Sequence, residues 1–239
     1  DFISPIGMFV IGYRADGEWG TSFGDTAGEG PMVIYILPLS KEFIFTAGYE
    51  QLAEGRLGTA AYGPGFVDSD GARWFVAGRY ARPNLEVGAL GMYVRMASTR
   101  PSALGAIDIG FKTLDTYWGG VYFKTTVGPV YIEGEYENWW GDLVKWDNLA
   151  VAKATLGAAT TDIELESQQW YLMAKLNLGP AYIGAQYAYS SGDDPGTLDT
   201  SEAYPSPGYS CWQPTLILFE DWTDRWASSL GSSGTTNNL

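Results

Sequence analysis

The sequence contains no histidine and a single cysteine, Cys211, among its 239 residues. The absence of histidine excludes Ser–His–Asp and Cys–His catalysis, zinc bound by histidine and haem held by histidine. One cysteine cannot form a disulfide within the chain, so Cys211 is interpreted as a free thiol. These absences argue against an enzyme and predict a protein without a cofactor.

Basic residues and long hydrophobic runs are also scarce. The chain has 14 Lys and Arg against 28 Asp and Glu, a net charge of −14, so no nucleic-acid partner is expected. No segment approaches the roughly 18 apolar residues that indicate a membrane-spanning helix. A membrane location stays open, because a transmembrane strand needs only about 9–11 residues with every second one apolar.

The chain does contain a repeated strand periodicity, in which apolar and polar residues alternate between Gly, Pro, Asn and Asp. The expected strands cover about 5–13, 31–39, 42–50, 73–82, 85–97, 113–127, 130–140, 165–178 and 181–190, with a tenth at 214–222. Short turns are expected at Ser40-Lys41, Pro83-Asn84, Gly128-Pro129 and Gly179-Pro180. Long polar loops are expected at roughly 14–30, 51–72, 98–112, 141–164 and 191–213. Short and long connections alternate strictly, which is typical of a transmembrane antiparallel up-and-down β-barrel.

Pairing across Gly128-Pro129 separates two faces of the hairpin. Lys124 then lies opposite Glu133 on a charged face, and Val121 lies opposite Tyr136 on an apolar face. The Gly179-Pro180 hairpin repeats this separation. Charges are rarely buried in a packed core, so we expect the charged face to meet water and the apolar face to meet lipid.

The Pro83-Asn84 hairpin fits this pattern less well. A two-residue register places Arg73 and Arg79 on one face with the apolar residues of the next strand, Leu90, Met92 and Val94. We expect a bulge or a longer turn that restores the pattern. Arg73, Arg79 and Arg95 would then point inward, and the apolar residues would point outward.

Two sets of residues follow from these faces. The residues expected to line a water-filled lumen are Lys124, Glu133, Glu135, Glu137, Lys175, Tyr122, Gln186, Arg73, Arg79 and Arg95. The residues expected to form an aromatic girdle at the membrane interface are Trp139, Trp140, Trp170, Tyr187 and Tyr189.

The glutamates at alternate positions allow a second interpretation. Glu133, Glu135 and Glu137 are spaced by roughly 6.5–7 Å along a strand, a separation compatible with the acid and base of an inverting glycosidase. No partner carboxylate or cleft can be identified in the sequence. The glutamates are therefore interpreted as one wall of a hydrated lumen.

Two Gly-rich acidic loops, DSDGAR (68–73) and SGDDPGTLDTSE (191–202), hold carboxylates at the short spacing of calcium sites. Neither has the full EF-hand spacing. Solvated loops are the favoured interpretation, and calcium in a loop is the alternative.

The strand SPIGMFVIGYR, the loop ADGEWGTSFGDTAGEG and the strand PMVIYILPL resemble the outer-membrane porins of Gram-negative bacteria. Within these the chain is most similar to alginate-export-type channels and related uncharacterised porins, also in GPAYIGAQYAYSSGDDPG (179–196) and QPTLILFED (213–221). The resemblance implies the cell outer membrane, with the lipid bilayer and lipopolysaccharide as partners, and a barrel of about 16–18 strands. We therefore expect one barrel domain over 1–239 that is incomplete at both ends. Asp25, in WGTSFGD, is a candidate for a loop folded into the barrel as a constriction.

The function expected is a porin through which small hydrophilic solutes or ions diffuse passively, without a chemical step. The acidic face favours cations or neutral solutes over alginate. The alternatives are a structural barrel that acts as sheath or scaffold for a partner, a barrel hydrolase, and a soluble β-sandwich binding module. A homo-oligomer is left open, because general porins are trimers and alginate-type channels are monomers.

Overall fold

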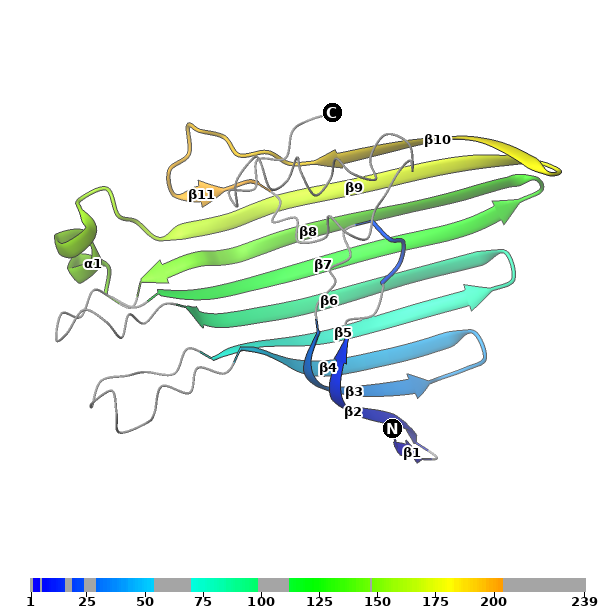
Figure 1. The fold of residues 1–239 in the computed structure, drawn as a ribbon, viewed down its shortest axis with the longest axis horizontal. Helices are drawn as coiled ribbons and strands as arrows, with labels where there is room; N and C mark the ends of the chain where they lie inside the picture. Colours follow the sequence, from blue (N-terminus) through cyan, green and yellow to red (C-terminus); the bar gives the residue numbers. More distant parts are fainter. Residues whose placement is uncertain are drawn as a thin grey trace.

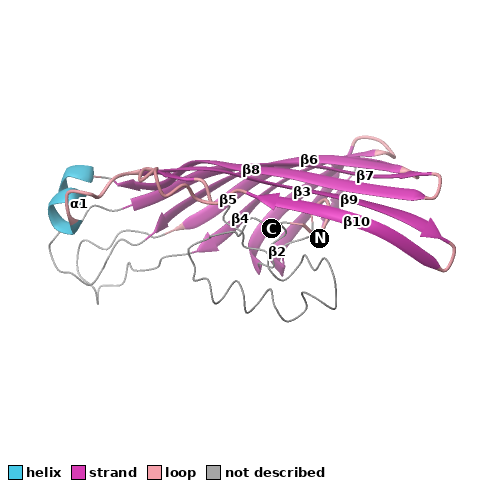
Figure 2. Cartoon of the chain, turned by 90° about the horizontal axis from the view of Figure 1, so that it is seen from above, coloured by secondary structure: helices cyan, strands magenta, loops and turns pink. Residues whose placement is uncertain are grey.

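The computed structural model describes residues 2–4, 6–15, 19–23, 29–53, 70–98, 112–146 and 148–203. Ten strands follow one another in chain order across a single sheet, and each pairs antiparallel with its neighbour (Figure 1). They are β1 (Phe2–Ser4), β2 (Gly7–Ala15), β3 (Glu29–Pro38), β4 (Phe43–Ala53), β5 (Gly71–Arg82), β6 (Leu85–Ser98), β7 (Lys112–Val127), β8 (Val130–Trp146), β9 (Ile163–Leu178) and β10 (Ala181–Ser190). Figure 2 shows that the sheet is arched. The predicted up-and-down antiparallel architecture is confirmed.

Two small elements complete the described part of the chain. The short strand β11 (Thr200–Ser201) pairs parallel with the beginning of β9. The helix α1 (Leu149–Leu156) lies in the connection between β8 and β9, where a loop was predicted. Its N-cap, Asn148, accepts a hydrogen bond from the backbone N–H of Val151 through its side chain. No helix among the described residues is long and apolar enough to cross a membrane.

The hairpin turns lie where the sequence predicts them. β7 and β8 pair from Val127 opposite Val130, and β9 and β10 pair from Leu178 opposite Ala181. Gly128 and Gly179 have φ of 60° and 73°, a left-handed conformation that glycine adopts without steric cost. The strand predicted at 214–222 and Cys211 lie outside the described residues.

Alternation along the strands gives the sheet two faces, which we name after a residue on each. The Val121 face carries exposed apolar side chains: Val121 is 52% exposed and Tyr136, opposite it on β8, is 42% exposed. The Glu135 face carries the buried side chains of the same strands, including Tyr122 and Glu135 itself, which is 4% exposed. The predicted pairing of Lys124 with Glu133 is confirmed and lies on the Glu135 face.

The prediction for the β5–β6 hairpin is wrong. Its register runs without a shift from Arg82 opposite Leu85 to Gly71 opposite Met96, so the expected bulge is absent. Arg73 and Arg79 lie on the Glu135 face as predicted, but they share it with the apolar residues of β6, namely Leu90, Met92 and Val94. Arg95 lies on the Val121 face, because it is an odd number of positions from these residues and strand side chains alternate.

The strands at the two ends of the order are not joined. Among the described residues no register pairs β10 with β1, so the described strands form an open, arched sheet.

Candidate functional site: the Glu135 face

The three glutamates of β8 lie on one face, as predicted, and each accepts hydrogen bonds from different donors. Glu133 accepts from the hydroxyl of Tyr131 at 2.6 Å and from the hydroxyl of Tyr171 at 2.9 Å. Glu137, which is 2% exposed, accepts from Nε2 of Gln169 at 2.8 Å and from Nε1 of Trp118 at 3.3 Å. These donors hold the carboxylates as fixed acceptors in the sheet surface.

Glu135 holds a segment from a distant part of the chain. Its Oε2 accepts from the backbone N–H of Thr21 at 2.8 Å and from the hydroxyl of Thr21 at 2.6 Å. On either side of this contact, the ring of Trp19 packs edge-on against Tyr122 and the ring of Phe23 stacks on Tyr171. In Figure 1 this segment is the short blue ribbon that crosses β7 and β8.

The segment Trp19–Phe23 therefore lies folded onto the Glu135 face. Gly20 makes the close approach possible, because a Cβ there would lie 2.8 Å from the Tyr122 ring and 2.9 Å from Glu135. Asp25, the predicted constriction residue, lies outside the described residues, whereas residues 19–23 of the same WGTSFGD stretch lie on the Glu135 face.

The half of the Glu135 face near the short turns is charged. Glu86, Lys124 and Glu133 form one row across β6, β7 and β8. Glu86 also accepts from the hydroxyl of Tyr122 at 2.9 Å and lies 4.0 Å from the guanidinium of Arg79.

The two lysines of this half lie over aromatic rings. Nζ of Lys124 is 5.7 Å from the centre of the Tyr122 ring, and Nζ of Lys175 is 5.2 Å from that of Tyr131. Both distances fit a cation–π interaction. Acidic and basic side chains therefore alternate at this end. Tyrosines contact both kinds, through hydrogen bonds to the carboxylates and through their rings to the lysines.

The half near the long loops carries apolar side chains on β6 and β7 and buried polar side chains on β8 and β9. Trp118 and Val94 are buried there, together with an ion pair between Arg73 and Glu50, whose carboxylate is 2% exposed. Leu90 and Met92 belong to the same half. Sequence reasoning missed this division, because it assumed a uniformly polar wall.

The structure brings nine of the ten predicted lumen residues onto the Glu135 face. These are Lys124, Glu133, Glu135, Glu137, Lys175, Tyr122, Gln186, Arg73 and Arg79. The exception is Arg95, whose Nε lies 3.7 Å from Asp115 on the Val121 face.

Four of the five residues predicted for the aromatic girdle share one face of the sheet, and the fifth lies on the other. Trp140, Trp170, Tyr187 and Tyr189 lie on the Val121 face. Trp139 lies on the Glu135 face, where its ring is 6.5 Å from that of Trp118. Adjacent strand residues point to opposite faces, so Trp139 and Trp140 cannot share one.

A longer aromatic row on the Val121 face was missed. Five rings from five adjacent strands contact one another in series, with centroids 5.0–5.9 Å apart. They belong to Tyr49, Trp74, Tyr93, Tyr117 and Trp140. With the observed β5–β6 register, in which Trp74 lies opposite Tyr93, the sequence would have predicted that these five rings form one row across the sheet.

The acidic loop 191–202 uses its carboxylates internally. Asp193 accepts from the backbone N–H of Glu202 at 3.1 Å, Asp194 from that of Gly196 at 2.8 Å, and Glu202 from the hydroxyl of Thr197 at 2.8 Å. Within the described ranges, no group of three or more acidic or cysteine side chains is placed to hold a metal ion. The loop 68–73 lies partly outside those ranges.

Comparison with known proteins adds no relative to this picture. No family model, no curated protein and no solved structure matches the chain. The functional interpretation therefore depends on the two faces of the sheet.

Proposed function

We propose that the protein is an outer-membrane porin, in which the sheet forms part of a barrel wall and small hydrophilic solutes or ions diffuse along the Glu135 face. The observation that carries the proposal is the exposed Val121 face. It presents large apolar side chains on consecutive strands, among them Val76, Val121, Phe123, Leu172 and Ile183.

Water is an unfavourable environment for such a surface. Exposed apolar area costs about 25 cal/mol per Å², and contiguous apolar patches of this kind mark interaction or membrane surfaces. The stacked row from Tyr49 to Trp140 lies at the long-loop side of the patch, where amphipathic rings suit a membrane interface. Lipid against the Val121 face accounts both for the exposed apolar side chains and for the row of aromatic rings.

The opposite face supplies the wall of the pathway. At the turn end it exposes the charged row of Glu86, Lys124 and Glu133 to solutes. Further along, the segment Trp19–Phe23 lies over β7, β8 and β9 and narrows the space beside the wall. Passage through such a channel depends on its width and wall charge and involves no chemical step.

A planar-bilayer experiment tests this proposal with the full-length protein. We expect single-channel conductance, and we expect Glu133→Gln to lower the preference for cations by several millivolts of reversal potential in a tenfold KCl gradient. Glu29→Gln is the matched control, because Glu29 is exposed on the Val121 face. Absence of conductance, or an equal shift in both variants, would contradict the proposal.

A second candidate function is a structural barrel that surrounds a partner protein. The apolar part of the Glu135 face on β6 and β7, with Leu90, Met92 and Trp118, favours it, because a purely aqueous wall has no need of these residues. Co-purification of a stoichiometric partner, lost when Met92 is changed to Lys, would favour the sheath over the channel.

A further inference from the structure

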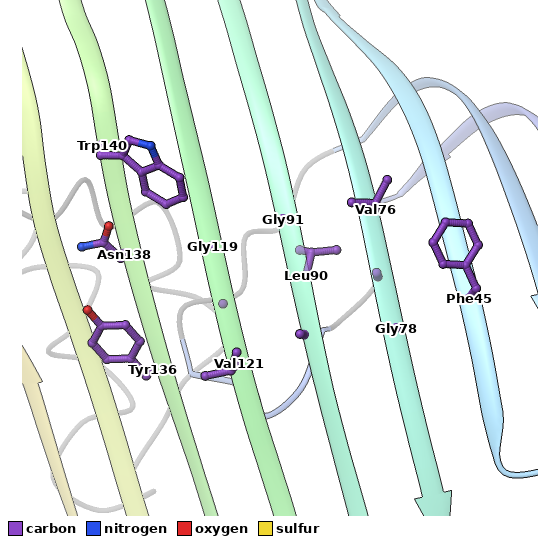
Figure 3. Close-up of a pocket in the computed structure, with 13 residues that line it drawn as sticks. Phe45, Val76, Gly78, Leu90, Gly91, Gly119, Val121, Tyr136, Asn138 and Trp140 are labelled. Atoms are coloured by element: carbon purple, nitrogen blue, oxygen red, sulfur yellow. The ribbon is translucent and has the colours of Figure 1, made fainter.

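The Val121 face is hollowed between β4 and β8. A cavity of about 520 Å³ opens there, with Val76, Val121, Tyr136 and Trp140 around it (Figure 3). Its floor contains Gly91 and Gly119, which face each other across β6 and β7. A Cβ on Gly91 would have no atom within 4 Å, so the space above this glycine is open.

A second cavity continues the first toward the long loops. It has a volume of about 510 Å³ and is lined by Tyr93, Asp115, Tyr117, Trp140, Gly141, Asp142, Glu164, Leu165 and Glu166. Trp140 belongs to both cavities, and its stacked contact with Tyr117, 5.9 Å between ring centres, lies at their junction. The two cavities therefore adjoin at Trp140, and the first is apolar whereas the second is acidic.

The acidic part is only partly neutralised by the protein. Asp115 lies 3.7 Å from Arg95 and accepts from the hydroxyl of Tyr93, and Lys145 donates to Asp142 at 2.7 Å. Glu164 and Glu166 are exposed, and neither forms an ion pair with any residue in the described part of the chain.

These features define the chemistry of an occupant. The apolar hollow suits a hydrocarbon chain, since burial of a CH₂ group is worth about 0.8 kcal/mol. The acidic part suits a positive charge. Because the carboxylates do not converge as metal ligands within the described ranges, an organic ammonium fits better than a metal ion.

We propose that the two cavities form one binding site for an amine-bearing lipid. Its acyl chain lies in the hollow over Gly91 and Gly119, its headgroup amine lies beside Glu164 and Glu166, and Tyr117 and Trp140 contact the region between them. This inference rests on the proposed membrane location of the Val121 face.

Native mass spectrometry of the detergent-solubilised full-length protein tests the site. The probes are phosphatidylethanolamine and phosphatidylglycerol with identical acyl chains, which differ in the amine. We expect the wild type to retain phosphatidylethanolamine about tenfold better, a difference of about 1.4 kcal/mol. Equal retention of the two lipids would overturn the proposal.

Variants separate the two parts of the site. Gly91→Leu fills the hollow and should lower retention of both lipids, whereas Ala174→Leu, an enlargement by one carbon less elsewhere on the Val121 face, should not. Glu164→Gln with Glu166→Gln should abolish only the preference for the amine. If Gly91→Leu and Ala174→Leu behave alike, the hollow is not the acyl site.

Conductance of the same preparations separates this inference from the proposed function. A conducting wild type without lipid preference would overturn the lipid site and leave the channel intact. A non-conducting protein in bilayers would contradict the channel, whatever lipid it retains.

Discussion

Glu135 is the residue through which the first part of the chain contacts the middle of the sheet. It accepts two hydrogen bonds from Thr21, which is 114 positions away in sequence. Hydrogen bonds to a charged group contribute about 1.5–3 kcal/mol each. The position of the segment Trp19–Phe23 therefore depends on this carboxylate as well as on the ring contacts of Trp19 and Phe23.

We predict that Glu135→Ala releases the segment Trp19–Phe23 from the sheet. The variant loses both hydrogen bonds from Thr21. Thr21→Val keeps the bond from the backbone N–H to Glu135 and loses two others, the one from its hydroxyl to Glu135 and the one that this hydroxyl accepts from the backbone N–H of Phe23. Single-channel recording should show a higher and noisier conductance for Glu135→Ala and a smaller change for Thr21→Val. Wild-type conductance in both variants would show that the segment does not narrow the pathway.

At the scale of single residues, the sequence was a good guide where side-chain alternation alone decides the face. Lys124 and Glu133 follow directly from a two-residue turn and a period of two. The prediction for Trp139 is wrong because it uses the aromatic character of this residue and ignores its position next to Trp140, which puts the two on opposite faces. The contact of Thr21 with Glu135 could not be predicted, because no sequence periodicity connects a loop with a distant strand.

At the scale of elements, the hairpins depend on their turns. Gly128 has φ of 60° in the two-residue connection between β7 and β8, and a Cβ there would meet no atom within 4 Å. Backbone conformation, and not available space, is therefore what favours glycine at this position. For an L-residue the left-handed conformation costs roughly 1–2 kcal/mol.

We predict that Gly128→Val destabilises the protein by about 1–2 kcal/mol through this turn. The measurement is the midpoint of urea unfolding in detergent or lipid. Gly91→Ala is the matched control, because its backbone is not left-handed and its Cβ has open space. Equal midpoints for the wild type and Gly128→Val would show that the turn carries no strain.

The wrong predictions for the β5–β6 hairpin and for helix α1 have a common cause. A bulge is predicted between β5 and β6 because a register without one places Leu90, Met92 and Val94 beside two arginines. The structure nevertheless has the register without a bulge. Helix α1 was missed because its eight residues are too few for a clear helical period. Both predictions are wrong because they expect each face of the sheet to be polar or apolar throughout and each long loop to lack secondary structure.

At the scale of the whole molecule, the arched sheet divides its surroundings in two. One face exposes apolar side chains over nine adjacent strands, from β2 to β10, and the other carries charges and holds the segment Trp19–Phe23. Strand order and the positions of the short turns were predictable, since each two-residue turn forces neighbouring strands to pair. The division of the Glu135 face into apolar and polar parts was not, because it depends on which side chains meet across neighbouring strands.

The proposed function requires that lipid covers the Val121 face and that water reaches the Glu135 face. Spin labels at successive positions 130–137, each introduced as a single cysteine in a Cys211→Ser background of the reconstituted full-length protein, test it most directly. We predict that accessibility to oxygen is highest at 130, 132, 134 and 136, and that accessibility to a water-soluble nickel complex is highest at 131 and 133. Equal access of the nickel complex to both sets would contradict the claim.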